Sequence, residues 1–117
     1  MSKDKDLRVY LDHILESIEF IQEDAHHISK ETFLKSHTLQ DAAIRRIIII
    51  GEAAKKLDQE FKNDHPEIPW RKITGTRDIL THEYFDVDLE KTWDIIQNDL
   101  PALELNIKKI LSSSPLQ

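Results

Sequence analysis

The residues best suited to chemistry lie in one short stretch, Arg77 to Tyr84, which reads R-D-I-L-T-H-E-Y. Arg77 supplies a permanent cation, His82 takes or gives a proton near neutral pH, and Tyr84 adds a phenol. Cleavage of a phosphodiester calls for such groups, because a cation stabilises the developing oxyanion while an acid/base group moves protons. We therefore take this stretch as the candidate site.

The spacing of these groups constrains the backbone that carries them. In a regular helix, Arg77 and His82 would lie about 140° apart around the axis, and His82 and Tyr84 about 200° apart. The three side chains would then not converge. Either the helix ends near Thr81 and the chain turns, or a second subunit completes the site; the sequence leaves both open.

The composition indicates that helices position this stretch. The 117 residues suit one domain, and with two glycines and four prolines, sheets joined by tight hairpins are unfavourable. We predict an all-α bundle of four main helices plus short connecting helices. A single domain is expected over residues 1–111, with a frayed tail over residues 112–117.

Apolar periodicity predicts the helices in order. A first helix is expected over residues 4–28, with one apolar seam from Leu7 to Ile28, followed by a connector or short helix over residues 29–37. Thr38 opens a capping-box-like T-L-Q-D, which predicts a second helix over residues 39–62. A short third helix is expected from Trp70, interrupted or bent at Gly75. Asp88 should cap a last helix over residues 89–111, kinked at Pro101.

The second helix contains four isoleucines in a row, Ile47 to Ile50. Four consecutive residues sweep about 300° of a helix, so this turn is apolar nearly all round. Either a partner subunit covers one side, or the helix is central within the monomer. Gly51 weakens the helix and allows another backbone to approach closely. Glu52 follows in apolar surroundings, where we expect it to pair with an arginine.

Several kinds of protein are disfavoured by composition. The absence of cysteine removes disulfides, thiolate metal sites and a cysteine nucleophile, and the histidines lack persuasive metal-ligand spacing. No apolar run suits a signal peptide or a membrane span, so a cytoplasmic protein is expected. The net charge of −6 argues against non-specific coating of nucleic acid but leaves room for a local basic groove. Its candidate residues are Arg45, Arg46, Arg71, Lys72 and Arg77.

The pattern R-x-x-x-x-H-x-Y, preceded by W-R-K-I-T-G-T and followed by V-D-L-E-K-T-W, resembles the HEPN superfamily. With I-I-G-E-A-A-K in the second helix, the resemblance covers nearly the whole chain. It is strongest to the HepT-like ribonuclease toxins, which pair with a minimal nucleotidyltransferase antitoxin. One departure is Asp78, where the family commonly has Asn; it adds an acidic group beside the expected phosphate site.

The resemblance implies a homodimeric HEPN bundle that cleaves RNA without a metal or other cofactor, at a cleft shared by two subunits. Carried over by residue, His82 would be the acid/base group, Arg77 would bind the scissile phosphate, and Tyr84 would position substrate or the His82 ring. The resemblance also implies that the nucleotidyltransferase can transfer adenylate to Tyr84, and it allows a higher assembly with the antitoxin. Arg45, Arg46, Glu52 and Asp78 are candidate supporting or RNA-binding residues.

Two other readings remain beside the ribonuclease. The same cleft could hold a nucleotide or RNA without cutting it, or serve only as a docking subunit for the transferase. A purely structural helical dimer is the other alternative to the ribonuclease. Loss of turnover without loss of RNA affinity in a His82→Ala variant would favour the enzyme.

Overall fold

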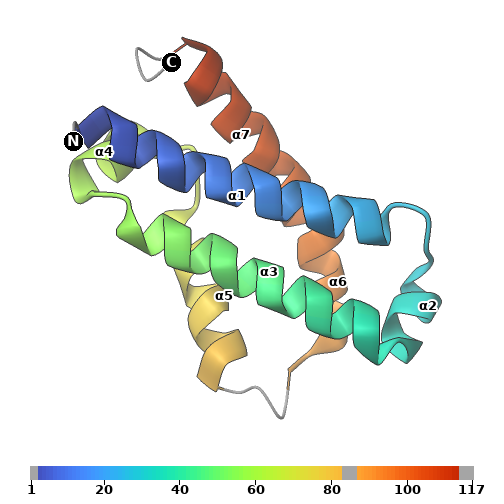
Figure 1. The fold of residues 1–117 in the computed structure, drawn as a ribbon. Helices are drawn as coiled ribbons and strands as arrows, with labels where there is room; N and C mark the ends of the chain where they lie inside the picture. Colours follow the sequence, from blue (N-terminus) through green and yellow to red (C-terminus); the bar gives the residue numbers. More distant parts are fainter. Residues whose placement is uncertain (1–2, 83–86, 114–117) are drawn as a thin grey trace.

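The computed structural model describes residues 3–82 and 87–113 (Figure 1). Over these ranges the chain forms helices and no strand, which confirms the predicted all-α class. The elements are α1 (Lys3–Ala25), α2 (Lys30–Lys35), α3 (His37–Lys56), α4 (Gln59–Asp64), α5 (Trp70–His82), α6 (Leu89–Asp94), the π-helical turn η2 (Ile95–Asp99) and α7 (Leu100–Ser113).

Two long helices, α1 and α3, run side by side in opposite directions across the front of Figure 1. Helix α5 packs on α3, and α7 packs on α1. The continuous run α6–η2–α7 acts as the fourth main element, while α2 and α4 are short connecting helices. This arrangement confirms the predicted bundle of four main helices.

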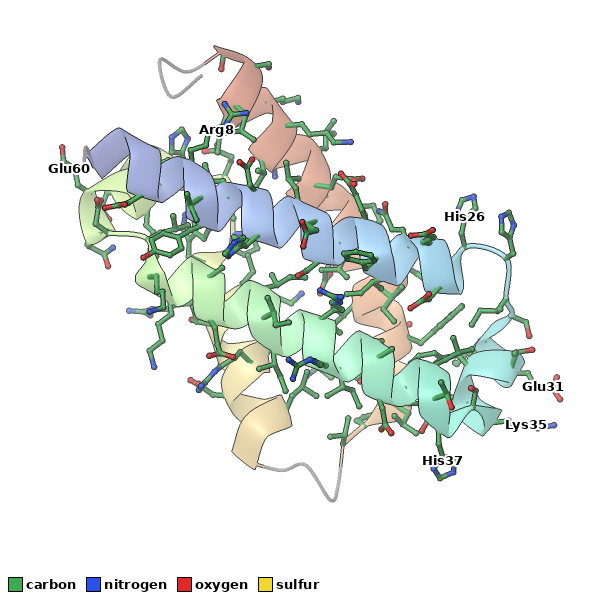
Figure 2. All side chains as sticks on the ribbon, viewed as in Figure 1. Arg8, His26, Glu31, Lys35, His37 and Glu60 are labelled. Atoms are coloured by element: carbon green, nitrogen blue, oxygen red, sulfur yellow. The ribbon has the colours of Figure 1, made fainter. Side chains whose placement is uncertain are left out.

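The core is built on the apolar seam of α1, as its periodicity predicted. Leu11, Ile14, Ile18 and Ile21 are each at most 1% exposed. The helix ends at Ala25 instead of residue 28, so His26 lies beyond it. Figure 2 shows the His26 side chain projecting from that end, away from the bundle.

Helix α3 differs from its prediction at both ends. Ser36, and not Thr38, is the N-cap, because its side chain accepts a hydrogen bond from the Leu39 backbone N–H at 3.2 Å. The helix stops at Lys56, because Asp58 caps a new helix, α4, by accepting from the Phe61 N–H at 2.8 Å. The prediction of a single helix over residues 39–62 was therefore wrong.

Helix α5 runs through Gly75 without interruption, contrary to the expected break. Asp88 caps the last helix, as predicted, by accepting from the Lys91 N–H at 3.0 Å. Because Pro101 has no N–H and crowds the preceding turn, the chain widens there into η2, in which the Leu100 N–H reaches the Ile95 carbonyl. Residues 112 and 113 belong to α7 and not to a frayed tail; residues 114–117 lie outside the described ranges.

No helix in the described part of the chain combines the length and the apolar composition needed to cross a membrane.

Candidate functional site

Helix α5 carries Arg77 and His82, and its first turn is anchored to α4. The indole N–H of Trp70 donates to the His65 carbonyl at 3.0 Å. The Trp70 ring also lies against Phe61, with 6.0 Å between ring centroids, and both residues are buried. The start of α5 is therefore fixed, so the direction in which the helix projects Arg77 is set from its base.

The middle of α5 is fixed by an unusually close approach to α3. A Cβ atom added to Gly51 would overlap the Cβ of Arg77, and it would lie 2.8 Å from Arg77 Cγ and 3.3 Å from the Ile73 carbonyl oxygen. Only glycine leaves room for this contact. The structure thus confirms that Gly51 permits another helix to approach, and it shows that the residue accommodated there is Arg77.

Arg77 is held with its guanidinium partly accessible. Its side chain is 23% exposed, and its Nε atom is buried. The terminal Nη1 donates to Oδ1 of Asp78 at 3.0 Å, and the Asp78 side chain is 52% exposed. A phosphate that bound Arg77 would compete with this carboxylate. Asp78 therefore lies where the sequence placed it, beside the candidate phosphate ligand.

His82 is the last residue of α5. The helix therefore continues one residue past the predicted end near Thr81, and Arg77 and His82 belong to one helix, about 140° apart around its axis. The side chain of His82 and the whole of Tyr84 lie outside the described part of the structure. The predicted roles of both residues stay predictions.

The other candidate cations are distributed over different surfaces. Arg45 is exposed on the outer face of α3. Arg46 points toward α1, where its guanidinium carbon lies 4.2 Å from the centroid of the Phe20 ring, a cation–π contact. Lys72 pairs with Asp99 of η2 at 3.2 Å. Arg45, Arg46 and Lys72 therefore have three different surroundings in the described subunit.

Glu52 departs from its prediction. It was expected in apolar surroundings with an arginine partner, but its side chain is exposed on α3. Helical geometry explains this, since Ala53 and Ala54 turn toward the core and leave Glu52 on the opposite side. Glu52 borders a shallow groove with Arg45, Ile48 and Val87, the last of which follows the candidate motif in sequence.

Sequence reasoning missed the link between Gly51 and Arg77. The available signal was a glycine in the interior of a long helix, since such a residue costs stability unless a close contact requires it.

Among the described residues, no group of three or more His, Cys, Asp or Glu side chains is placed to hold a metal ion.

The chain matches a family model described as "Ribonuclease HepT-like" over residues 14–110. It is 49% identical over 107 residues to "Gamma-glutamylcyclotransferase and putative RNase" of Methanocaldococcus jannaschii. The aligned region covers 92% of this chain and 48% of that relative. It is also 45% identical to a "Putative RNase" of Caldanaerobacter subterraneus subsp. tengcongensis, over 89% of this chain and 93% of the relative. A "Probable ribonuclease HepT" of Thermococcus cleftensis is 44% identical to this chain, and the aligned region covers 86% of this chain and 92% of that relative.

This chain thus spans about half the length of the first of these relatives and nearly all of the other two. No solved structure matches it significantly. The family match covers most of the core of the bundle and both residues of the Gly51–Arg77 contact. The chain belongs to the HepT-like ribonuclease family of the HEPN superfamily.

Proposed function

We propose that this chain is the toxin component of a toxin–antitoxin module and acts as a metal-independent endoribonuclease. The observation that carries the proposal is the placement of Arg77. Its Cβ packs on Gly51 while its guanidinium stays partly accessible. A fixed, partly desolvated arginine suits the stabilisation of a phosphate in the transition state, because a preorganised charge need not be reoriented during the reaction.

The proposed reaction uses the nucleophile that RNA itself carries. The 2′-OH loses its proton to a base and attacks the adjacent phosphorus, and the 5′-oxygen of the next nucleotide leaves with a proton from an acid. The products are a 2′,3′-cyclic phosphate and a 5′-OH end. Arg77 stabilises the charge on the phosphoryl oxygens, and His82 transfers protons. Because one histidine cannot readily act as base and acid together, the two subunits of a homodimer would each supply one.

Tyr84 gives the proposed site a means of control. A partner nucleotidyltransferase would attach adenylate to the Tyr84 hydroxyl and release pyrophosphate from ATP. The added group is bulky and anionic and lies two residues from His82, so it would exclude an RNA phosphate by sterics and by charge. Mass spectrometry of the chain produced with and without such a transferase tests this step, and an unmodified Tyr84 in both samples would rule it out.

The nuclease is tested with purified protein whose mass confirms an unmodified Tyr84. In excess EDTA we expect RNA to be cleaved with cyclic phosphate ends, and we expect a His82→Ala variant to lose turnover while keeping RNA affinity. His37→Ala is the matched control, since His37 is exposed at the start of α3 and points outward in Figure 2. Cleavage that requires a metal, or that survives in His82→Ala, would contradict the mechanism.

One observation favours a non-catalytic alternative, in which the chain binds RNA or a nucleotide, or docks the transferase, without cutting. The Asp78 carboxylate already occupies Nη1 of Arg77. If this pair only restrains a nuclease, Asp78→Asn should raise the cleavage rate several-fold, because the amide competes less with phosphate. If the chain is a binding subunit, Asp78→Asn should raise RNA affinity and produce no cleavage.

A further inference from the structure

A cavity of about 180 Å³ lies between α5 on one side and η2 with α7 on the other, and we call it the α5–η2 cavity. Its apolar lining includes Ile47 and Ile50 of α3, Ile73 of α5, Ile95 of η2, and Leu100 and Leu103 of α7. Protein interiors contain few voids larger than a water molecule, and an apolar cavity of about 150 Å³ is large enough to bind benzene. The α5–η2 cavity therefore has room for a small molecule somewhat larger than benzene.

Two amide side chains border this apolar space, Asn98 of η2 and Asn106 of α7. Neither amide has a hydrogen-bond partner among the described residues. The hydroxyl of Thr76, which also lines the cavity, instead donates to the Lys72 carbonyl at 2.8 Å. A primary amide offers both donors and an acceptor. The two amides can therefore pair with a ligand that carries a donor next to an acceptor.

The charged residues that line the cavity have partners of their own. Nζ of Lys72 lies 3.2 Å from Oδ2 of Asp99 in η2. Glu67 is exposed, and its carboxylate lies 3.4 Å from Nδ1 of His65. A charged ligand would lose its hydration among apolar side chains without gaining an unpaired counter-charge, which is unfavourable. The lining therefore favours a neutral ligand.

The wall formed by η2 and α7 is the one that can adjust to a ligand. Helix α5 cannot move toward α3, because Gly51 has no space beside Arg77. By contrast, η2 is a π-helical turn, a rare geometry that is frequent at functional sites. The Lys72–Asp99 pair that links α5 to η2 is exposed, and exposed pairs contribute little to stability. This pair therefore opposes the entry of a ligand only weakly.

We propose that the α5–η2 cavity binds a neutral heteroaromatic molecule of about two fused rings that carries a hydrogen-bond donor beside an acceptor. The apolar lining buries the rings, and the amides of Asn98 and Asn106 bind the polar edge. An apolar pocket with a few convergent polar groups is the usual form of a small-molecule site. Thr76 lines this cavity, whereas Arg77 packs on Gly51. The inference therefore goes beyond the proposed function and does not depend on it.

Matched probes test the site on the purified full chain. 7-Azaindole is a neutral two-ring molecule with an N–H donor beside a ring-nitrogen acceptor, and indole has the same shape without the acceptor. We expect 7-azaindole to bind with a Kd below about 1 mM. Indole should bind about 3–10-fold more weakly, because one hydrogen bond is lost. The anionic indole-3-carboxylate should not bind measurably. Isothermal titration calorimetry measures the three affinities, and changes in backbone-amide NMR shifts should concentrate on α5, η2 and α7.

Replacing both amides tests the polar edge of the site. The double variant Asn98→Leu/Asn106→Leu should bind 7-azaindole and indole equally, because leucine has a similar size but no hydrogen-bonding group. Asn63→Leu is the matched control, since Asn63 is the remaining asparagine of the chain and lies on α4, outside the cavity lining. It should keep the preference for 7-azaindole. A preference that survives in the double variant would overturn the proposal.

A larger side chain at the edge of the cavity tests the space itself. Ala102 is exposed and lines the cavity. Ala102→Phe should weaken 7-azaindole binding at least about 10-fold, because the ring occupies volume that the probe requires. Leu105→Phe on the same helix is the control, because Leu105 is 56% exposed and does not line the cavity. Circular dichroism confirms that each variant is folded.

The result is separable from that of the nuclease assay, because binding is measured without RNA. A wild type that does not bind 7-azaindole, or that binds indole or indole-3-carboxylate as tightly, would overturn the proposal. Unchanged binding by Ala102→Phe would overturn it as well, because the probe would then lie elsewhere. Loss of RNA cleavage with intact 7-azaindole binding would reject the nuclease and leave the cavity site in place.

Discussion

The two sides of helix α5 are held in different ways. Toward α3, α5 packs so closely that Gly51 has no space for a side chain beside Arg77. Toward η2 and α7, a mostly apolar cavity of about 180 Å³ separates the helices, and Ile73, Thr76 and Leu103 are among its lining residues. The Lys72–Asp99 ion pair links α5 to η2 at 3.2 Å, and both of its side chains are well exposed.

This difference shows where the molecule requires precision. The side of α5 that faces α3, the tight side, holds the backbone of Arg77, the residue proposed to bind phosphate. A charge stabilises a transition state best when its position is fixed beforehand. The side of α5 that faces η2 and α7, the loose side, holds no proposed catalytic group. Substitutions on the two sides of α5 should therefore have unequal effects on RNA cleavage and on stability.

The largest effect is expected at Arg77. Arg77→Ala removes the proposed phosphate ligand but keeps the Cβ that packs on Gly51, so we expect cleavage to fall by about 100–1000-fold with the helical fold retained. Single-turnover cleavage and circular dichroism measure the two quantities. The matched control is Thr76→Ala, the preceding residue, which lines the cavity. Equal losses in the two variants would show that the tight side has no special role.

The next largest effect is expected at Gly51. Gly51→Ala forces α3 and α5 apart, and overpacking of this kind costs about 1–3 kcal/mol of unfolding free energy. The overlap is with Arg77 Cβ, so adding Arg77→Ala should not relieve it. Adding Arg77→Gly should relieve part of it, even though glycine in a helix itself costs about 1 kcal/mol. Urea unfolding of these three variants, of Arg77→Ala and Arg77→Gly alone, and of the wild type measures the cost of Gly51→Ala in each background. A cost that is the same in the Arg77→Ala and Arg77→Gly backgrounds would contradict the contact.

A smaller effect of opposite sign is expected at Gly75, which lies in α5. A Cβ there meets no atom within 4 Å. Gly75→Ala should therefore raise the unfolding free energy by about 0.5–1 kcal/mol, because alanine restricts the unfolded chain and suits a helix better. The same urea titration measures this change. A destabilised Gly75→Ala would show that both glycines of the chain are sterically required.

The smallest effect is expected at the exposed ion pair on the loose side. Asp99→Asn removes the charge that faces Lys72, and pairs as exposed as this one contribute about 0–1 kcal/mol. The unfolding free energy should change within that range, and the change should shrink further in high salt. A loss above about 2 kcal/mol would mean that the loose side is held as firmly as the tight side.

The sequence predicted the elements that depend on local patterns. The seam of α1 and the Asp88 cap follow from residues close in the chain, and both are confirmed. The break at Asp58 was missed because the stretch is periodic enough for one long helix, and only the burial of Leu57 and Phe61 shows why the chain turns. The π-helical turn before Pro101 was predicted only as a kink, since either solution accommodates a missing N–H.

The residue types of the candidate site could be proposed from the sequence, but the surroundings of Arg77 could not. Arg77, His82 and Tyr84 stood out because their chemistry is complementary and they lie close in sequence. The contact between Gly51 and Arg77 joins residues 26 positions apart, and no local pattern reports which residue a helical glycine accommodates. Glu52 was misplaced for a related reason, since apolar neighbours in sequence do not determine which face of a helix a side chain occupies.

Cleavage through the 2′-OH of RNA is tested most directly with a matched pair of substrates. One is a short RNA that the protein cuts at a mapped position, and the other is the same strand with a single 2′-deoxy substitution on the 5′ side of that position. In excess EDTA, we predict cleavage of the first with a cyclic phosphate end and none of the second at that position. Cleavage of both substrates at the same position would contradict the mechanism, because the attacking oxygen would then have to come from water.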